Sequence, residues 1–281
     1  MATTAPLAPR GAITEASPWI GILARAGFAA RGVVSCTIGI LAALAALGDG
    51  QGRTTGSKGA LRELHEQPFG QVLLAIVGVG LFGYALWLFV QAALDPEHTA
   101  RRSKHPALLR VGRFFDGFVH VGLGVYAFGL VTGVALGSDE DGVKSWTARL
   151  LGLDGIGRLL VAVVGAVVIG RGVLDLWKAA KARLDQELDL SSLPANRRKA
   201  TVDICRFGLA SRAVVFALIG AFLVMAAART RAADAEGLGG TLRTIQGWSY
   251  GWALLAVVAL GFVAYGVYQV VLARYRRVRI A

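Results

Sequence analysis

The stretch Arg25–Gly32, RAGFAARG, decides the fold because it opens an apolar run and then recurs along the chain. No charged residue follows it from Val33 to Leu47. Similar strings stand at Arg110–Gly117, RVGRFFDG, and at Arg206–Ala213, RFGLASRA. Since a charge inside an apolar helix is costly, Arg31 needs a structural or functional explanation.

The composition predicts an all-α integral membrane protein. The chain has 281 residues, of which 55% are hydrophobic, and its mean hydropathy is +0.56. Soluble domains are on average about half apolar, and the excess here is concentrated in runs of the roughly 20 residues that cross a bilayer as a helix. The six predicted transmembrane helices are Arg25–Leu47, Gly70–Leu94, Val111–Leu136, Ile156–Ala180, Ile204–Ala228 and Gly251–Ala273.

The net charge of +12 reports membrane orientation. Basic residues gather in the loops after the second and fourth spans and in the tail, whereas the other loops mix bases with acids. Because lysine and arginine in short loops stay on the cytoplasmic side, both termini are predicted to be cytoplasmic. The basic balance also predicts contact with anionic lipid headgroups, and it argues against nucleic acid as a partner.

The chain repeats itself three times. Arg25 and Arg206 begin stretches that match at a constant offset, so that Arg31 aligns with Arg212 and Tyr84 aligns with Tyr265. The middle third of the chain also aligns with these stretches and has Asp116 at the position of Arg31. Each copy holds two spans and enters the membrane in the same direction, which predicts three tandem parallel two-helix repeats with pseudo-threefold symmetry.

The predicted divisions follow from these repeats. They are a leader at 1–24, repeats at 25–94, 110–180 and 204–273, a cytoplasmic loop at 95–109, a cytoplasmic linker at 181–203 and a basic tail at 274–281. Cys36 and Cys205 suit neither a metal site nor a disulfide framework, so both are interpreted as packing residues.

Three two-helix modules that open with Arg-x-Gly-x-x-x-Arg-Gly resemble the bacterial membrane family called domain of unknown function 1206. The string ALRELHEQPFGQVLLAIVGVGLFGYALW, Ala60 to Trp87, is similar to the second half of that module. The resemblance implies a multi-pass protein of the bacterial inner membrane and no particular biochemical role. The middle copy departs from the pattern at Asp116.

The repeat symmetry predicts a charged cluster inside the membrane. It brings Arg31, Asp116 and Arg212 to one level on the cytoplasmic side, where Arg171 and Asp175 from the fourth span join them. Such a cluster predicts a polar funnel that faces the cytoplasm and is closed by apolar packing on the outer side. The candidate ligand-binding residues are Arg31, Asp116, His120, Arg171, Asp175 and Arg212.

Other interpretations of the same residues stay open. The charges also suit a buried network that fixes helix packing, while His120, one turn after Asp116, suits either a proton relay or a satisfied hydrogen bond. Arginines near span ends suit contacts with lipid headgroups; they are Arg25, Arg110, Arg206, Arg276 and Arg277. Aromatic residues near the cytoplasmic ends suit an interfacial belt; they are Tyr84, Trp87, Trp177, Tyr265 and Tyr275.

Two classes of function follow from these patterns. The first is a binding or transport protein for a small anionic solute or lipid headgroup at the arginine cluster, and the second is a structural or interaction protein whose charges fix its helices. The sequence shows no nucleophile–base pairing, no metal-ligand spacing and no paired carboxylates at lipid-accessible depth, so we expect no enzyme activity, catalytic residue, metal or cofactor. The oligomeric state stays open between a monomer and a homo-oligomer.

Overall fold

The structure is helical throughout its described part. This computed structural model describes residues 18–48, 52–94, 106–134, 137, 139–153, 155–181, 190 and 193–275. Its elements are α1 (Pro18–Leu47), α2 (Ser57–Glu66), α3 (Gly70–Ala93), α4 (Pro106–Thr132), α5 (Asp139–Leu151), α6 (Gly157–Lys181), α8 (Ala195–Arg229), the 3₁₀ turn η1 (Ala232–Asp234), α9 (Leu238–Gln246) and α10 (Gly251–Tyr275).

Six of these helices have the length and hydropathy of membrane spans, which confirms the predicted fold class. They are α1, α3, α4, α6, α8 and α10. At 35 residues, α8 is about 52 Å long, whereas the hydrocarbon core is about 30 Å thick. Helices that exceed the bilayer thickness are accommodated by tilting. We therefore expect the spans to be inclined to the membrane normal. A charged residue inside an inclined span lies at a smaller depth below the membrane surface than its distance along the helix axis.

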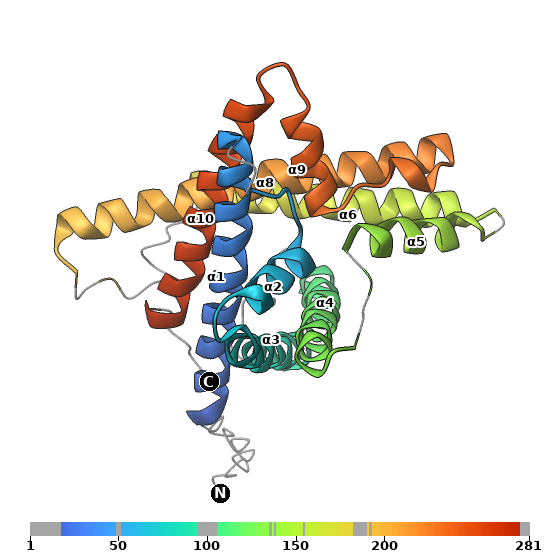
Figure 1. Cartoon of the computed structure of the whole chain (residues 1–281). Coiled ribbons are helices and arrows are strands. Elements are labelled where there is room, and N and C mark those ends of the chain that lie inside the picture. The colour runs from blue at the N-terminus through green and yellow to red at the C-terminus, as the bar shows by residue number, and fades with distance from the viewer. Residues whose placement is uncertain are drawn as a thin grey trace, which may run out of the picture.

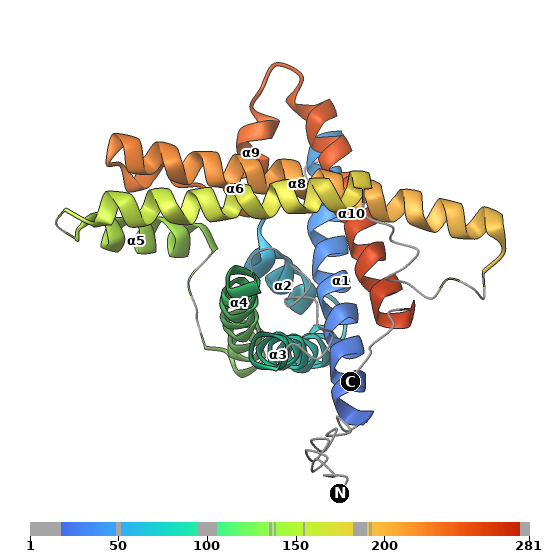
Figure 2. The same ribbon diagram turned by 180° about the vertical axis from the view of Figure 1, so that it is seen from behind.

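The spans pack in three antiparallel pairs, each built from two different repeats. The pairs are α3 with α4, α6 with α8, and α1 with α10. Figure 1 shows that α1 and α10 run side by side, that α6 and α8 run across them, and that α3 and α4 point along the line of sight. The view from behind in Figure 2 shows the same three directions. The first and last spans therefore close the ring, although no short loop joins them.

Equivalent glycines make equivalent contacts in the three pairs, which is the pseudo-threefold symmetry in atomic terms. In each pair, a Cβ atom added to one glycine would lie within 3.0 Å of the facing helix. The contacts are Gly39 with Val263, Gly124 with Phe82, and Gly220 with Ile169. Small residues allow such close approach in lipid, where the hydrophobic effect does not draw helices together.

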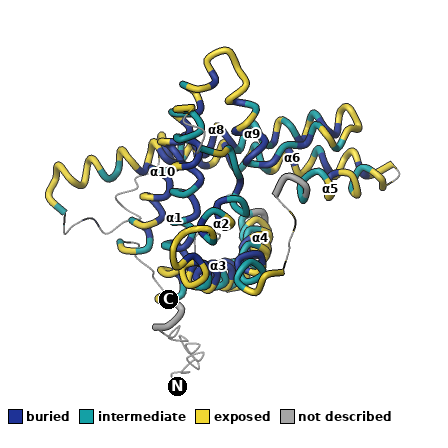
Figure 3. Tube along the Cα trace, in the orientation of Figure 1, coloured by how far each residue is buried: buried dark blue, intermediate teal, exposed yellow. Residues whose placement is uncertain are grey.

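Short helices from the loops complete the apolar core on the side away from the first residues of α1 and the last residues of α10. Leu61 and Leu64 of α2, with Leu242 and Ile245 of α9, are buried in one cluster with apolar residues of α1, α3, α4, α8 and α10. Figure 3 shows buried positions gathered where the pairs meet and exposed positions along the far ends of α6 and α8. The centre of the molecule is thus the most enclosed region.

Candidate functional site

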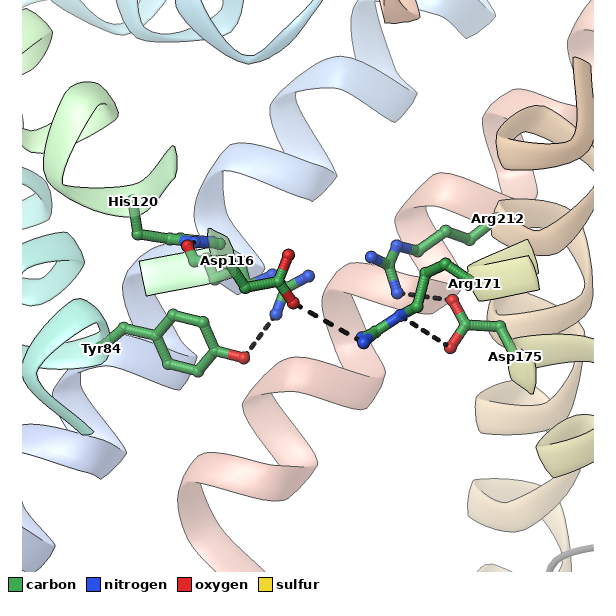
Figure 4. Close-up of polar contacts among 7 residues, drawn as sticks. Tyr84, Asp116, His120, Arg171, Asp175 and Arg212 are labelled. Carbon is green, nitrogen blue, oxygen red and sulfur yellow. Dashed lines mark hydrogen bonds and ion pairs between the residues drawn. The ribbon is translucent and has the colours of Figure 1, made fainter. Parts of the chain in front are cut away.

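The candidate site lies where the three helix pairs cross, and every span contributes a side chain to it. We call this set the central cluster: Arg31 of α1, Tyr84 of α3, Asp116 and His120 of α4, Arg171 and Asp175 of α6, Arg212 of α8 and Tyr265 of α10. Figure 4 shows Asp116 and Asp175 lying on either side of Arg171. All six predicted ligand-binding residues therefore lie in one region, although their role in binding stays a prediction.

Asp175 and Arg212 form the most enclosed contact of the cluster. Arg212 Nη1 donates to Asp175 Oδ2 at 2.6 Å, and the two side chains are only 7% and 5% exposed. The Arg212 guanidinium also lies 4.8 Å from the ring centre of Tyr265 and 4.2 Å from that of Phe216. A short charge-assisted hydrogen bond is a strong contact, and the two aromatic rings near the guanidinium stabilise the charge further.

Asp116 and Arg171 form a second, looser ion pair. Arg171 Nη1 lies 3.6 Å from Asp116 Oδ2, and the side chains are 42% and 37% exposed. Arg171 Nε lies 3.7 Å from Asp175 Oδ1, which is too far for a hydrogen bond. This Nε atom is shielded from solvent and has no hydrogen-bond acceptor among the described residues.

Arg31 is held by aromatic groups. Its Nη1 donates to the Tyr84 hydroxyl at 2.6 Å, and its guanidinium faces the rings of Tyr84 and Tyr265 at 5.1 and 5.8 Å. In contrast to Arg171 and Arg212, it forms no ion pair with a carboxylate of the described residues. The cluster thus contains three guanidinium groups and two carboxylates, with Arg31 as the excess positive charge.

His120 contacts the main chain and an aromatic ring. Its Nδ1 lies 2.7 Å from the carbonyl oxygen of Asp116, so the ring donates from this nitrogen, because a carbonyl oxygen only accepts. The ring also meets that of Tyr84 edge-on, with the centres 4.7 Å apart. The Asp116 carboxylate, which the relay interpretation would pair with His120, instead faces Arg171.

Apolar layers enclose the central cluster on two sides. The cluster that includes Val34 and Phe262 lies on the side away from the first residues of α1 and the last residues of α10. A second apolar cluster, with Phe28, Trp87 and the linker residue Leu190, packs toward the first residues of α1 and the last residues of α10. The polar funnel expected to open toward the cytoplasm stays a prediction, and buried apolar side chains lie next to the central cluster in both directions.

Tyr84 and Tyr265 belong to the cluster, although the sequence analysis placed them in an interfacial belt. Both are buried, as is Trp87, whereas Trp177 is more than half exposed. The belt is therefore wrong for the three buried residues. One signal in the sequence could have identified the tyrosines as cluster members: they occupy the repeat position that Arg171 holds in the middle copy.

The arginines predicted to contact headgroups differ in their surroundings. Arg25 and Arg206 are exposed, as expected for such a contact, whereas Arg110 is half-buried. The Nε atom of Arg110 is shielded from solvent and has no acceptor among the described residues. Arg276 and Arg277 lie outside the described residues.

Comparison with known proteins identifies the family of this chain. The family model described as Domain of Unknown Function (DUF1206) matches residues 26–95, 111–182 and 207–276. The chain belongs to the DUF1206 family. A Bacillus subtilis (strain 168) protein printed as "Uncharacterized protein YxxB" is 31% identical over 262 residues, which cover 93% of each chain. No solved structure matches the chain.

The DUF1206 matches coincide with the structural repeats. Each begins one position after an arginine at the start of a repeat, namely Arg25, Arg110 and Arg206. Each DUF1206 copy therefore supplies two spans and two members of the central cluster at matching positions. Within the described part of this DUF1206 protein, no group of three or more His, Cys, Asp or Glu side chains is placed to hold a metal ion.

Proposed function

We propose that this membrane protein binds a small anionic group, either a solute or a lipid headgroup, at the central cluster as part of a binding or transport activity. One observation carries the proposal: three guanidinium groups face two carboxylates, and Arg31 forms no ion pair with any described carboxylate. An anion at this position would neutralise the excess charge.

The cost of burying charge supports this assignment. An arginine at the centre of a membrane helix costs about 2.5–3.5 kcal/mol on insertion scales. Arg212 offsets that cost through Asp175, whereas Arg31 donates to a phenol and faces two aromatic rings, without a direct ion pair to a described carboxylate. The Nε donor of Arg171, which has no hydrogen-bond acceptor among the described residues, lies in the same cluster, so that an incoming anion would find donors from two helices.

The proposed setting is the bacterial cytoplasmic membrane with both termini in the cytoplasm. The basic residues of the loops after the second and fourth spans and of the tail support this orientation. It puts the apolar cluster that contains Phe28 and Trp87 on the cytoplasmic side. The proposed activity is binding or transport without catalysis.

A second candidate function is that of a structural protein whose charges fix the helix packing. The contact between Arg212 and Asp175 favours it, because this pair joins α8 to α6 and is almost completely buried. Buried polar pairs in membrane proteins hold specific helices together. This account predicts that the cluster binds no anion and that its charges matter only for stability.

Two substitutions with opposite effects on the cluster charge separate these accounts. Arg31→Met removes the excess charge, and Asp116→Asn adds a further one. If an anion binds, native mass spectrometry from phosphatidylglycerol nanodiscs should show a discrete adduct on the wild type. We expect about ten- to a hundredfold weaker retention in Arg31→Met, the loss of one charged hydrogen bond of about 1.5–3 kcal/mol.

The Asp116→Asn variant provides the opposite control and should retain the anion at least as well as the wild type. Binding of radiolabelled inorganic phosphate to the detergent-purified proteins tests the free anion in parallel. If the wild type carries neither a discrete lipid nor phosphate, or if both variants behave like the wild type, the binding proposal fails and the structural account is preferred.

A further inference from the structure

The two spans of the middle repeat lie apart at the position where the two spans of each other repeat are in close contact. A Cβ atom added to Gly27 would lie 2.5 Å from Cβ of Tyr84 in the first repeat, and one added to Gly208 would lie 2.4 Å from the backbone nitrogen of Tyr265 in the third. The corresponding Gly112 meets nothing within 4 Å. Over the described residues, α4 and α6 therefore lack the close packing that joins α1 to α3 and α8 to α10.

Side-chain size explains this break in symmetry. In the first repeat, Gly80 of α3 packs against Ala30 of α1, 2.6 Å from the added Cβ to the alanine methyl group. The middle repeat has Val167 and Phe115 at these two positions, and their side chains are 56% and 64% exposed. Because large apolar side chains replace small ones, α4 and α6 cannot approach as the other spans do.

Charged groups lie at this same separation. Asp116 and Arg171 bridge α4 and α6 at 3.6 Å and are more than one-third exposed, whereas the Arg212–Asp175 pair is almost fully enclosed. Apolar exposure alone is ordinary in a membrane protein, since lipid covers it. A partly exposed ion pair between apolar side chains at the depth of the spans is unusual, because charges there normally face the interior.

We propose that an anionic phospholipid of the cytoplasmic leaflet enters sideways between α4 and α6 and places its phosphate at Arg171, next to the excess charge of Arg31. This inference rests on the proposed function and names the substrate class and the route. Buried apolar side chains flank the central cluster along the axis of the bundle. Asp116 and Arg171, which face each other across the separation between α4 and α6, are more exposed than Asp175 and Arg212.

The chemistry of this lateral opening, defined by Gly112, Phe115, Val167 and Arg171, selects a lipid over other occupants. A free anion would satisfy Arg171 but would leave Phe115 and Val167 uncovered. A second copy of the chain would bring an identical cluster with excess positive charge, which is electrostatically unfavourable. An anionic lipid supplies both a phosphate for the guanidinium and acyl chains for the apolar side chains.

The test fills the opening without altering any charge. Gly112→Leu and Gly170→Leu add bulk from α4 and α6, at positions where an added Cβ meets nothing within 4 Å. Gly122→Leu is the matched control, since Gly122 is also exposed on α4 and meets nothing within 4 Å, about 15 Å farther along the helix. Each protein is measured by native mass spectrometry from nanodiscs of phosphatidylglycerol and of phosphatidylcholine, and by phosphate binding in detergent.

We expect the wild type and Gly122→Leu to retain one phosphatidylglycerol and little phosphatidylcholine. Retention should fall about tenfold or more in Gly112→Leu and Gly170→Leu, while phosphate binding stays unchanged because the arginines are intact. Equal retention in all four proteins would overturn the lateral route. Phosphate binding without lipid retention, or a dimer without bound lipid, would also overturn it.

Loss of the proposed function gives a different result. In that case, neither phosphatidylglycerol nor phosphate is retained by the wild type. Selective loss of lipid in the two opening variants therefore supports the inference, and retention of phosphate alone rejects it while the anion site remains.

Discussion

Arg31 and Arg212 occupy the same position in two repeats, yet their removal should affect stability differently. Arg212→Met breaks the hydrogen bond of 2.6 Å to Asp175, a side chain only 5% exposed. Breaking a buried ion pair typically costs about 3–5 kcal/mol, because one charge is left uncompensated. Arg171 still lies 3.7 Å from Asp175, so we expect the lower end, about 3 kcal/mol.

The same calculation for Arg31→Met gives a small net effect. The variant loses the hydrogen bond to Tyr84, and a bond of this charged type contributes about 1.5–3 kcal/mol. It also removes a charge that costs about 2.5–3.5 kcal/mol at the centre of a span. Since no described carboxylate pairs with Arg31, the two contributions nearly cancel, and the change should be within about 1 kcal/mol.

Reversible unfolding in bicelles, followed for both variants and the wild type, measures this contrast. A difference of about 2–4 kcal/mol between the variants corresponds to roughly 30- to 900-fold in the unfolding constant. A double-mutant cycle with Asp175→Asn should show coupling of up to about 3 kcal/mol with Arg212 and little with Arg31. Equal losses for the two arginines, or equal coupling to Asp175, would refute the charge assignment.

Two further predictions concern packing and orientation. Gly27→Ala should destabilise the protein by about 1–3 kcal/mol, because its new methyl group would lie 2.7 Å from the Tyr84 backbone. Gly112→Ala should be neutral or stabilise the protein by about 0.5–1 kcal/mol. Thermal unfolding of the two variants measures this difference. In a background with both cysteines replaced, a membrane-impermeant maleimide should label Ser249→Cys in intact cells and Asn196→Cys only after permeabilisation, and the reverse pattern would invert the proposed topology.

Much of the central cluster could be predicted from repeat register. The alignment of Arg31 with Asp116 and Arg212 predicted that one level of the membrane would hold all three, because equivalent positions of symmetric repeats lie around one axis. The structure places these residues in one region with Arg171 and Asp175. Tyr84 and Tyr265 were assigned to a belt, since an aromatic residue near a span end has the same local sequence whether it faces lipid or the interior.

The sequence by itself determined the six spans and their threefold repetition, because hydrophobic run length and recurring spacing are local properties of the chain. Tertiary structure alone decided which spans pair. Packing of small residues such as Gly39 and Gly220 across different repeats closes the ring between α1 and α10. It also decided that α4 and α6 stay apart, since the effect of Phe115 and Val167 depends on the helix that each one faces. In lipid, where no hydrophobic effect draws helices together, that fit between facing surfaces selects the partners.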